Sequence, residues 1–84
     1  MQQCEIEIAA TPGLNASASA RLAQLASKYQ CEISLTRNGR RVNAKSLMGV
    51  MMLAAARGSR VVVETEGPDE TEALVAILAL IGEA

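Results

Sequence analysis

Two segments of the chain alternate apolar and polar residues with period two, which predicts half-buried β-strands. The first is Cys4-Glu5-Ile6-Glu7-Ile8, and the second is Glu32-Ile33-Ser34-Leu35-Thr36. A further strand is expected over Arg60–Glu66, because its Val61-Val62-Val63 centre strongly prefers β-structure. Each strand then has one apolar and one polar face.

Turn residues separate these segments. Thr11-Pro12-Gly13 breaks the first strand. Asn38-Gly39 supplies the two positive-φ residues of a tight type I′ hairpin. The chain is expected to return as a short strand, Arg40-Arg41-Val42, which lies at a sheet edge because charge there discourages pairing with other chains.

Helical spacing begins at Ala16. Asn15 stands just before it, in a position where Asn is among the best N-caps. Polar residues occupy the other side of this helix, so one stripe faces a core, formed by Ala18, Leu22, Leu25 and Tyr29.

Two more helices are expected further along. Ser46 is placed to cap a short apolar helix from Leu47 to about Leu53, with Gly58 as its C′ residue. Asp69, with Glu72 three residues later, has the spacing of a capping box for a helix from about Glu70 to Ile81, which Gly82 ends. Its buried stripe is Ala73, Leu74, Ile77, Leu78 and Ile81.

The predicted order is β-α-β-β-α-β-α in a single domain, residues 1–84. One antiparallel sheet with three helices on one face lets every strand and helix bury its apolar side, so the predicted fold class is α+β. The other sheet face is left to solvent.

Composition excludes several classes of protein. The chain is 50% apolar with a net charge of −1, which argues against disorder and against nucleic-acid binding. The apolar run Ala73–Ile81 is too short to span a bilayer, and no signal peptide opens the chain, so a cytoplasmic protein is expected. Aromatic content is 1%, which leaves a thin aliphatic core of modest stability.

The chain contains no histidine, which removes histidine bases, nucleophiles and metal ligands. Cys4 and Cys31 lack metal-ligand spacing and are expected to be free thiols. Neither a metal nor a cofactor is predicted. A serine nucleophile at Ser17 or Ser19 would lack its base.

The motifs Gly13-Leu14-x-Ala16-x-Ala18-Ser19-Ala20, Asn38-Gly39, Val42–Leu53 and Gly67-Pro68-Asp69-Glu70 resemble the HPr family, small phosphocarriers of the bacterial sugar phosphotransferase system. The resemblance covers nearly the whole chain and implies an open-faced β-sandwich. Family members accept a phosphoryl group from Enzyme I on the histidine of a Gly-Leu-His-Ala-Arg motif and pass it to IIA proteins.

This chain differs from the family motif at the two positions that carry out phosphoryl transfer. Asn15 stands at the histidine position and Ser17 at the arginine position. A carboxamide nitrogen has its lone pair delocalised into the carbonyl, so Asn15 cannot act as the nucleophile. Only the free N–H groups at the start of the helix survive as a weak anion site, and Asn15 itself could occupy them as a cap.

The resemblance also implies a partner surface and a regulatory site. In the family, the start of the first helix and the short second helix meet Enzyme I and IIA proteins, and the residues expected here are Ala16, Ala20, Arg21, Leu47, Met48 and either Met51 or Met52. Val50 and Leu53 are expected in the core. Ser46 resembles the serine that HPr kinase/phosphorylase modifies in many relatives, although its cap position already explains it. Four arginines, Arg21, Arg40, Arg41 and Arg57, form either a positive rim or ordinary solvated surface.

The expected function is therefore that of a monomeric HPr-like protein that cannot relay phosphate and acts by binding partners. The family includes a regulatory homologue in which an amide residue also replaces the histidine. Two alternatives stay open: a genuine phosphocarrier deliberately altered at Asn15 and Ser17, and an HPr-like interaction module recruited outside sugar transport.

Overall fold

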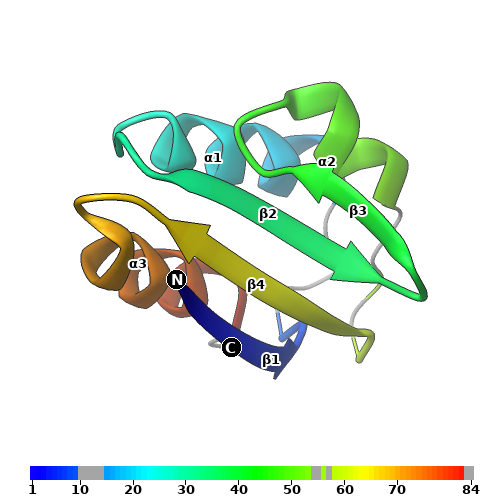
Figure 1. Ribbon diagram of the computed structural model, residues 1–84. Helices are drawn as coiled ribbons and strands as arrows, with labels where there is room; N and C mark the ends of the chain where they lie inside the picture. The colour runs from blue at the N-terminus through cyan, green and yellow to red at the C-terminus, as the bar shows by residue number, and fades with distance from the viewer. Residues whose placement is uncertain (10–14, 54–55, 57, 83–84) are drawn as a thin grey trace.

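Four antiparallel strands form one sheet, and three helices cover one of its faces (Figure 1). The computed structural model describes residues 1–9, 15–53, 56 and 58–82. The elements are β1 (Gln2–Glu7), α1 (Ala16–Ala26), β2 (Glu32–Arg37), β3 (Arg40–Asn43), α2 (Leu47–Leu53), β4 (Arg60–Glu66) and α3 (Glu70–Gly82). This order confirms the predicted α+β open-faced sandwich, and each expected element is present.

The strands lie in the order β1-β4-β2-β3, so β4 and β2 are central. Because side chains alternate along a strand, register decides which face each residue occupies. In β4, Val61, Val63 and Thr65 are buried toward the helices, while the alternate residues lie on the open face. Glu5 is aligned with Val62 on that open face, as the alternation in β1 predicts.

The hairpin between β2 and β3 confirms the type I′ prediction. Asn38 has φ 51° and Gly39 has φ 80°, the two positive values that this turn requires. The following strand, Arg40–Asn43, pairs with β2 and lies at the sheet edge, as its charge predicts.

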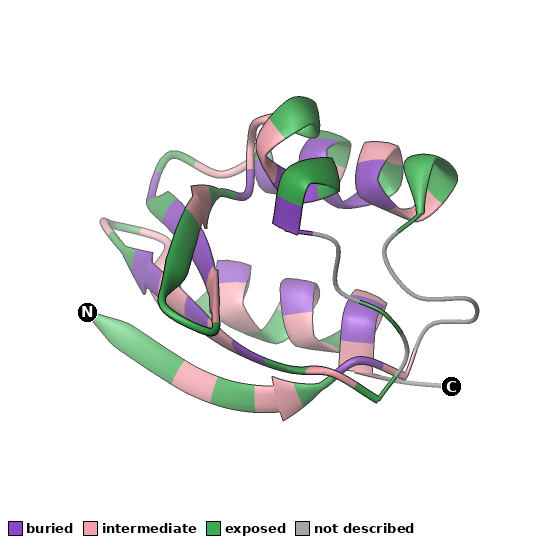
Figure 2. Cartoon of the chain, turned by 90° about the vertical axis from the view of Figure 1, so that its right-hand side faces the viewer, coloured by how far each residue is buried: buried purple, intermediate pink, exposed green. Residues whose placement is uncertain are grey.

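The core lies between the sheet and the helices and is aliphatic. Seen from the side, the helices lie on one side of the sheet, with buried residues recurring along them (Figure 2). The largest fully buried apolar side chains are Ile8, Leu22, Leu35, Val50, Val61, Val63, Ile77 and Ile81. On α3 the members of the predicted stripe are buried or half-buried, which confirms its amphipathic reading.

The capping-box prediction for Asp69 is wrong. Both carboxylate oxygens accept backbone N–H groups from the opposite loop, those of Gln30 and Cys31, each at 2.9 Å. The carboxylate thus joins two loops instead of closing its own helix. Gly67 makes this approach possible, because at φ 148° a Cβ there would lie 2.6 Å from the Cα of Cys31.

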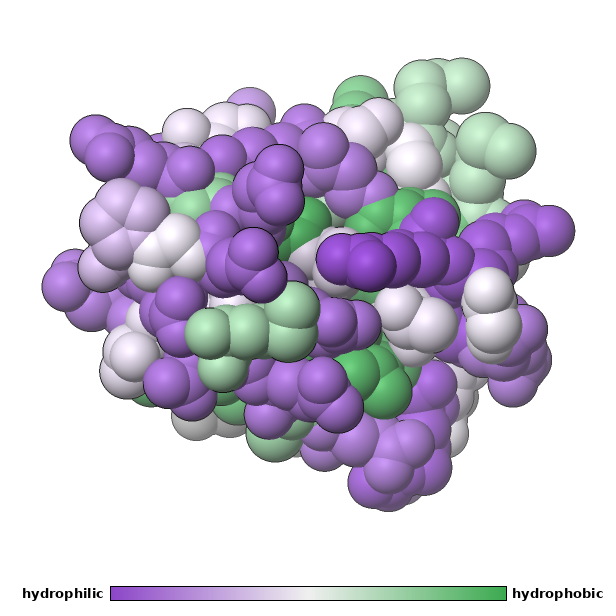
Figure 3. Space-filling model, viewed as in Figure 1, coloured by the Kyte–Doolittle hydropathy of each residue, from purple (hydrophilic) through white to green (hydrophobic). Residues whose placement is uncertain are grey.

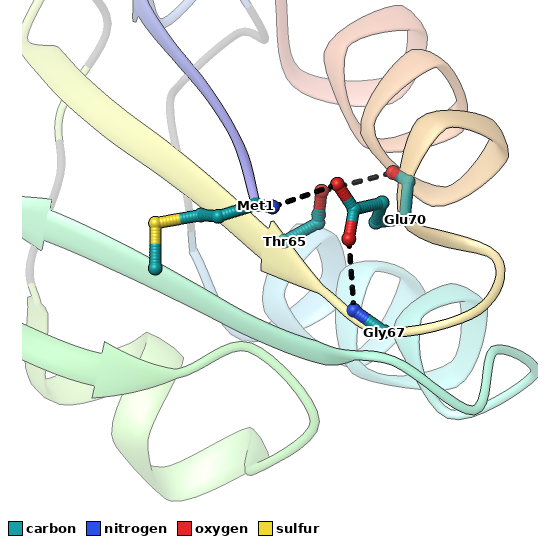
Figure 4. Close-up of polar contacts among 4 residues, drawn as sticks. All are labelled: Met1, Thr65, Gly67 and Glu70. Atoms are coloured by element: carbon teal, nitrogen blue, oxygen red, sulfur yellow. Dashed lines mark hydrogen bonds and ion pairs between the residues drawn. The ribbon is translucent and has the colours of Figure 1, made fainter.

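Glu70 performs a related task at the start of α3 (Figure 4). Its Oε1 accepts the N–H of Gly67 at 3.1 Å, and its Oε2 lies 3.0 Å from the amino group of Met1. The hydroxyl of Thr65 donates to the Glu70 carbonyl at 2.9 Å. The end of β4, the turn and the first turn of α3 are therefore held as one unit.

The prediction that Gly58 is the C′ residue of the second helix is also wrong. The helix ends at Leu53, whereas the Gly58 N–H donates to the carbonyl of Ile8 at 2.9 Å. Its φ of 89° serves the turn into β4. The Thr11-Pro12-Gly13 turn, Gly13-Leu14 and Arg57 lie outside the described residues.

Candidate functional site

The N-terminus of α1 is capped by the residue that precedes it, Asn15. Asn15 has extended backbone, with φ −75° and ψ −175°, and its Oδ1 accepts the N–H of Ala18 at 2.9 Å. The Asn15 carbonyl accepts the N–H of Ser19 at 2.8 Å, the first helical hydrogen bond. The structure therefore confirms Asn15 as the N-cap.

The residues that follow Asn15 lie on the surface. Ala16, Ser17 and Arg21 are exposed and Ala20 is half-buried. Ser17 is in the first turn of α1, where its hydroxyl carries no charge. Ser19 is buried, so it faces the interior and not this surface.

Ser46 is the N-cap residue of α2, as predicted. Its Oγ accepts the N–H of Gly49 at 3.1 Å, and its carbonyl accepts the N–H of Val50 at 3.0 Å. The residue is half-buried, and its own N–H donates to the carbonyl of Asn43. The hydroxyl thus lies at the N-terminus of α2, in a half-buried position.

Helix α2 exposes most of its large apolar side chains. Four large side chains are exposed, namely Leu47 at 43%, Met48 at 68%, Met51 at 41% and Met52 at 61%. Val50 and Leu53 are buried, as predicted. Apolar surface gathers over α2 at the upper right of Figure 3, beside a largely hydrophilic sheet face. α2 also packs against α1 (Figure 1), so the two helices present neighbouring surface.

Two arginines hold the last carbonyl groups of α2. Arg40 Nη1 donates to the Met52 carbonyl at 3.0 Å, and Arg37 Nη1 reaches the Leu53 carbonyl at 3.4 Å. The sequence leaves Arg40 as either part of a positive rim or ordinary solvated surface, and it does not single out Arg37. The missed signal is general: cations are favoured at helix C-termini, and α2 has no basic residue of its own in its last turn.

Three further features of the described residues concern reactive thiols, metal sites and membrane spans. Cys4 and Cys31 are free thiols, and burial together with the Asp69 carboxylate raises the pKa of Cys31. No group of three or more Cys, Asp or Glu side chains in these parts of the chain is arranged to hold a metal ion. None of the helices seen in the structure has the length and apolar character to cross a bilayer.

Comparison with known proteins shows which family has this sequence and fold. The family described as "PTS HPr component phosphorylation site" matches residues 2–83. The phosphocarrier protein HPr of Cupriavidus necator is 61% identical over 69 residues, which cover 82% of this chain and 78% of that protein. The HPr-like protein Crh of Halalkalibacterium halodurans is 41% identical and covers 96% of both chains.

Solved structures agree. The crystal structure of HPr from Bacillus anthracis superposes with a TM-score of 0.93 at 38% identity, covering 95% of each chain. The crystal structure of Bacillus subtilis Crh, described as a dimer with a swapped domain, gives a TM-score of 0.77 at 38% identity over 95% of this chain and 92% of that one.

The open-faced sandwich, the helix start and the apolar second helix are those of a small HPr-type domain. The chain belongs to the HPr family of the phosphotransferase system.

Proposed function

We propose that this chain is an HPr-family protein that does not relay phosphate through position 15 and acts by binding partners of the phosphotransferase system in the bacterial cytoplasm. Enzyme I and IIA proteins are the partners that the family implies. The observation that carries the proposal is the hydrogen bond from the Ala18 N–H to Asn15 Oδ1.

That hydrogen bond opposes phosphate relay in two ways. The group at position 15 is a carboxamide without a free nitrogen lone pair, and its oxygen already occupies one of the amides that would bind phosphate oxygens. Ser17 adds no positive charge to compensate for a transferring phosphoryl group. With no histidine in the chain, no other imidazole can take over the step.

The docking surface is proposed to combine the start of α1 with α2, through Ala16, Ala20, Arg21, Leu47, Met48 and Met51. Unbranched, polarizable methionines suit adaptable contacts with more than one partner. Met52, 61% exposed, is added to this surface by its exposure. The chain is proposed to act as a monomer, since the edge strand β3 carries Arg40 and Arg41.

Ser46 is proposed as a regulatory phosphorylation site for HPr kinase/phosphorylase. Its hydroxyl lies beside the Gly49 N–H and adjoins the exposed Leu47 and Met48. A phosphate of about −2 charge placed there would change the docking surface without entering the core. Relatives named HPr-like protein Crh, including the Bacillus subtilis protein described as "Catabolite Repression HPr", support a regulatory role.

A phosphate-transfer assay with Enzyme I and labelled phosphoenolpyruvate tests the proposal. The chain is expected to gain no acid-labile label, whereas Asn15→His with Ser17→Arg is expected to gain it. Label on the unchanged chain would contradict the proposal. Recovery in the double variant supports an intact Enzyme I surface. A folded but inactive double variant would instead favour a module recruited outside sugar transport.

A further inference from the structure

The sheet face opposite the helices carries a hollow of about 360 Å³ that the proposed docking surface does not use. Residues of β2, β3 and β4 line it, together with Met1, whose side chain crosses over β4 toward β2 (Figure 4). This volume lies within the range of small-molecule sites. The hollow is therefore large enough for a small organic ligand.

Ser34 is one of the residues that line this hollow. It is only 8% exposed, and its Oγ has no hydrogen-bond partner in the part of the chain that the structure describes. Ser34 is aligned with Glu64 of β4 and with Asn43 of β3, and both of these residues also line the hollow. A buried hydroxyl without a partner is costly, so this atom points to a polar group that binds there.

Three carboxylates border the hollow. Glu32 is aligned directly with Glu66 across the β2–β4 pair, and Glu64 is two residues along the same face. Within the described residues, the ion pairs are Met1–Glu70 and Arg60–Glu5, so none of the three has one. Like charges that face each other across strands destabilise a sheet, and a bound cation would relieve that repulsion.

The positive side chains at the hollow offset only part of this negative charge. The ammonium of Lys45 is committed, because Nζ donates to the Tyr29 carbonyl at 2.7 Å. Arg41 borders the hollow from β3 and is exposed. The hollow thus combines three carboxylates and a buried hydroxyl with two cations, Lys45 and Arg41, so negative charge is in excess among the side chains that line it.

We propose that this hollow binds a small molecule that carries a primary ammonium group. The three N–H donors of an ammonium match the carboxylates of Glu32 and Glu66 and the Oγ of Ser34. Two sources have this chemistry: a simple amine, and an amino acid whose carboxylate would pair with Arg41. This site is independent of the docking surface on α1 and α2.

An amide chemical-shift titration of the whole chain tests the site, with putrescine and with L-lysine as probes. Saturable shifts are expected at residues 32–34 and 64–66, with a dissociation constant of about 1 mM. Magnesium chloride at matched ionic strength controls for general screening. If magnesium produces the same shifts, or if neither probe shifts these residues, the proposal is overturned.

Variants identify the groups involved. Glu66→Gln is expected to weaken binding about fivefold and Glu32→Gln/Glu66→Gln to abolish it, since each removes an ion pair with the ligand. Glu72→Gln removes the same charge from an exposed position on α3 and is expected to leave binding unchanged. Equal weakening by Glu72→Gln would show a non-specific charge effect and overturn the site.

Two further measurements complete the test. The unliganded double variant is expected to melt no lower than the unchanged chain, because it relieves repulsion, so its loss of binding is not a loss of fold. Arg41→Ala is expected to weaken L-lysine binding and spare putrescine if an amino acid is the ligand. Equal binding of both probes, unaffected by Arg41→Ala, identifies a simple amine.

Discussion

The backbone N–H of Cys31 donates a hydrogen bond of 2.9 Å to the carboxylate of Asp69, which lies 38 residues further along the chain. The same carboxylate accepts the N–H of Gln30. Two loops at one end of the sandwich are therefore joined by a single side chain. Its charge state affects the stability of both.

This junction predicts a pH dependence of stability. Hydrogen bonding from the Gln30 N–H, and then from the Cys31 N–H, holds the pKa of Asp69 below its ordinary value of 3.8. Because the folded pKa is the lower one, the contribution to stability is complete above the unfolded pKa. It is lost as the pH falls through the folded pKa.

Urea unfolding at about pH 6 and about pH 3 measures this effect. The unchanged chain is expected to be less stable at the lower pH, and Asp69→Asn is expected to reduce the difference. Some pH dependence will remain, because the Gly67 N–H and the Met1 amino group also lower the pKa of Glu70. An Asp69→Asn variant with the full pH dependence would contradict the prediction.

The close approach of the same loops makes Gly67 irreplaceable. Gly67→Ala combines a positive φ with a Cβ 2.6 Å from backbone, and is expected to destabilise the fold by about 3 kcal/mol. Gly39→Ala is the matched control, since its φ is also positive but no atom lies within 4 Å of the added Cβ. Its cost should be about 1 kcal/mol from backbone strain alone. Thermal unfolding compares the two, and equal losses would rule out the clash.

The N-cap of α1 gives a third prediction. Asn15→Ala removes the acceptor of the Ala18 N–H and is expected to cost about 1 kcal/mol of unfolding free energy. Asn15→Asp keeps an acceptor and should retain nearly all of the stability. Denaturant unfolding of both variants checks this. An Asn15→Ala variant as stable as the unchanged chain would show that the cap contributes nothing.

The exposed methionines of α2 are predicted to act in binding rather than in folding. Met48→Glu is expected to change the unfolding free energy by less than about 0.5 kcal/mol, since the side chain is largely exposed, and to weaken binding to Enzyme I. Val50→Ala, in the buried row of the same helix, is expected to cost about 2 kcal/mol. Calorimetry of unfolding and of binding separates the two effects. Equal loss of stability and binding in Met48→Glu would assign that residue to the core.

Arg40 is predicted to stabilise the end of α2. Arg40→Ala removes the donor to the Met52 carbonyl, and amide exchange in α2 is expected to quicken about twofold to fivefold. Arg41→Ala removes the same charge one residue away, on the open face, and should leave α2 protection unchanged. Equal acceleration in the two variants would indicate a general charge effect.

Local signals predicted most of the fold. Asn38-Gly39, the valine run of β4 and the Asn15 cap each depend on residues within a few positions, and the structure confirms all three. The errors arose where distant residues compete for the same group. Asp69 has the local spacing of a capping box, but its carboxylate binds the amides of residues 30 and 31. No local sequence pattern predicts a contact between residues so far apart in the chain.

In the candidate site, too, features set by local sequence were predicted, and contacts set by tertiary packing were not. The sequence predicted the Ser46 cap and the exposed side of α2, because both follow from helical geometry. The contacts of Arg37 and Arg40 with the end of α2 depend on how the hairpin packs beside that helix. The hollow around Ser34 likewise exists only once three strands are aligned.

Asn15 also ties the capping of α1 to the chemistry that position 15 can perform. An imidazole lacks the amide oxygen that accepts the Ala18 N–H, so a change of Asn15 to histidine that supplies a relay nucleophile also removes this acceptor. The two traits, a firmly closed helix and a reactive one, compete for a single position in the chain.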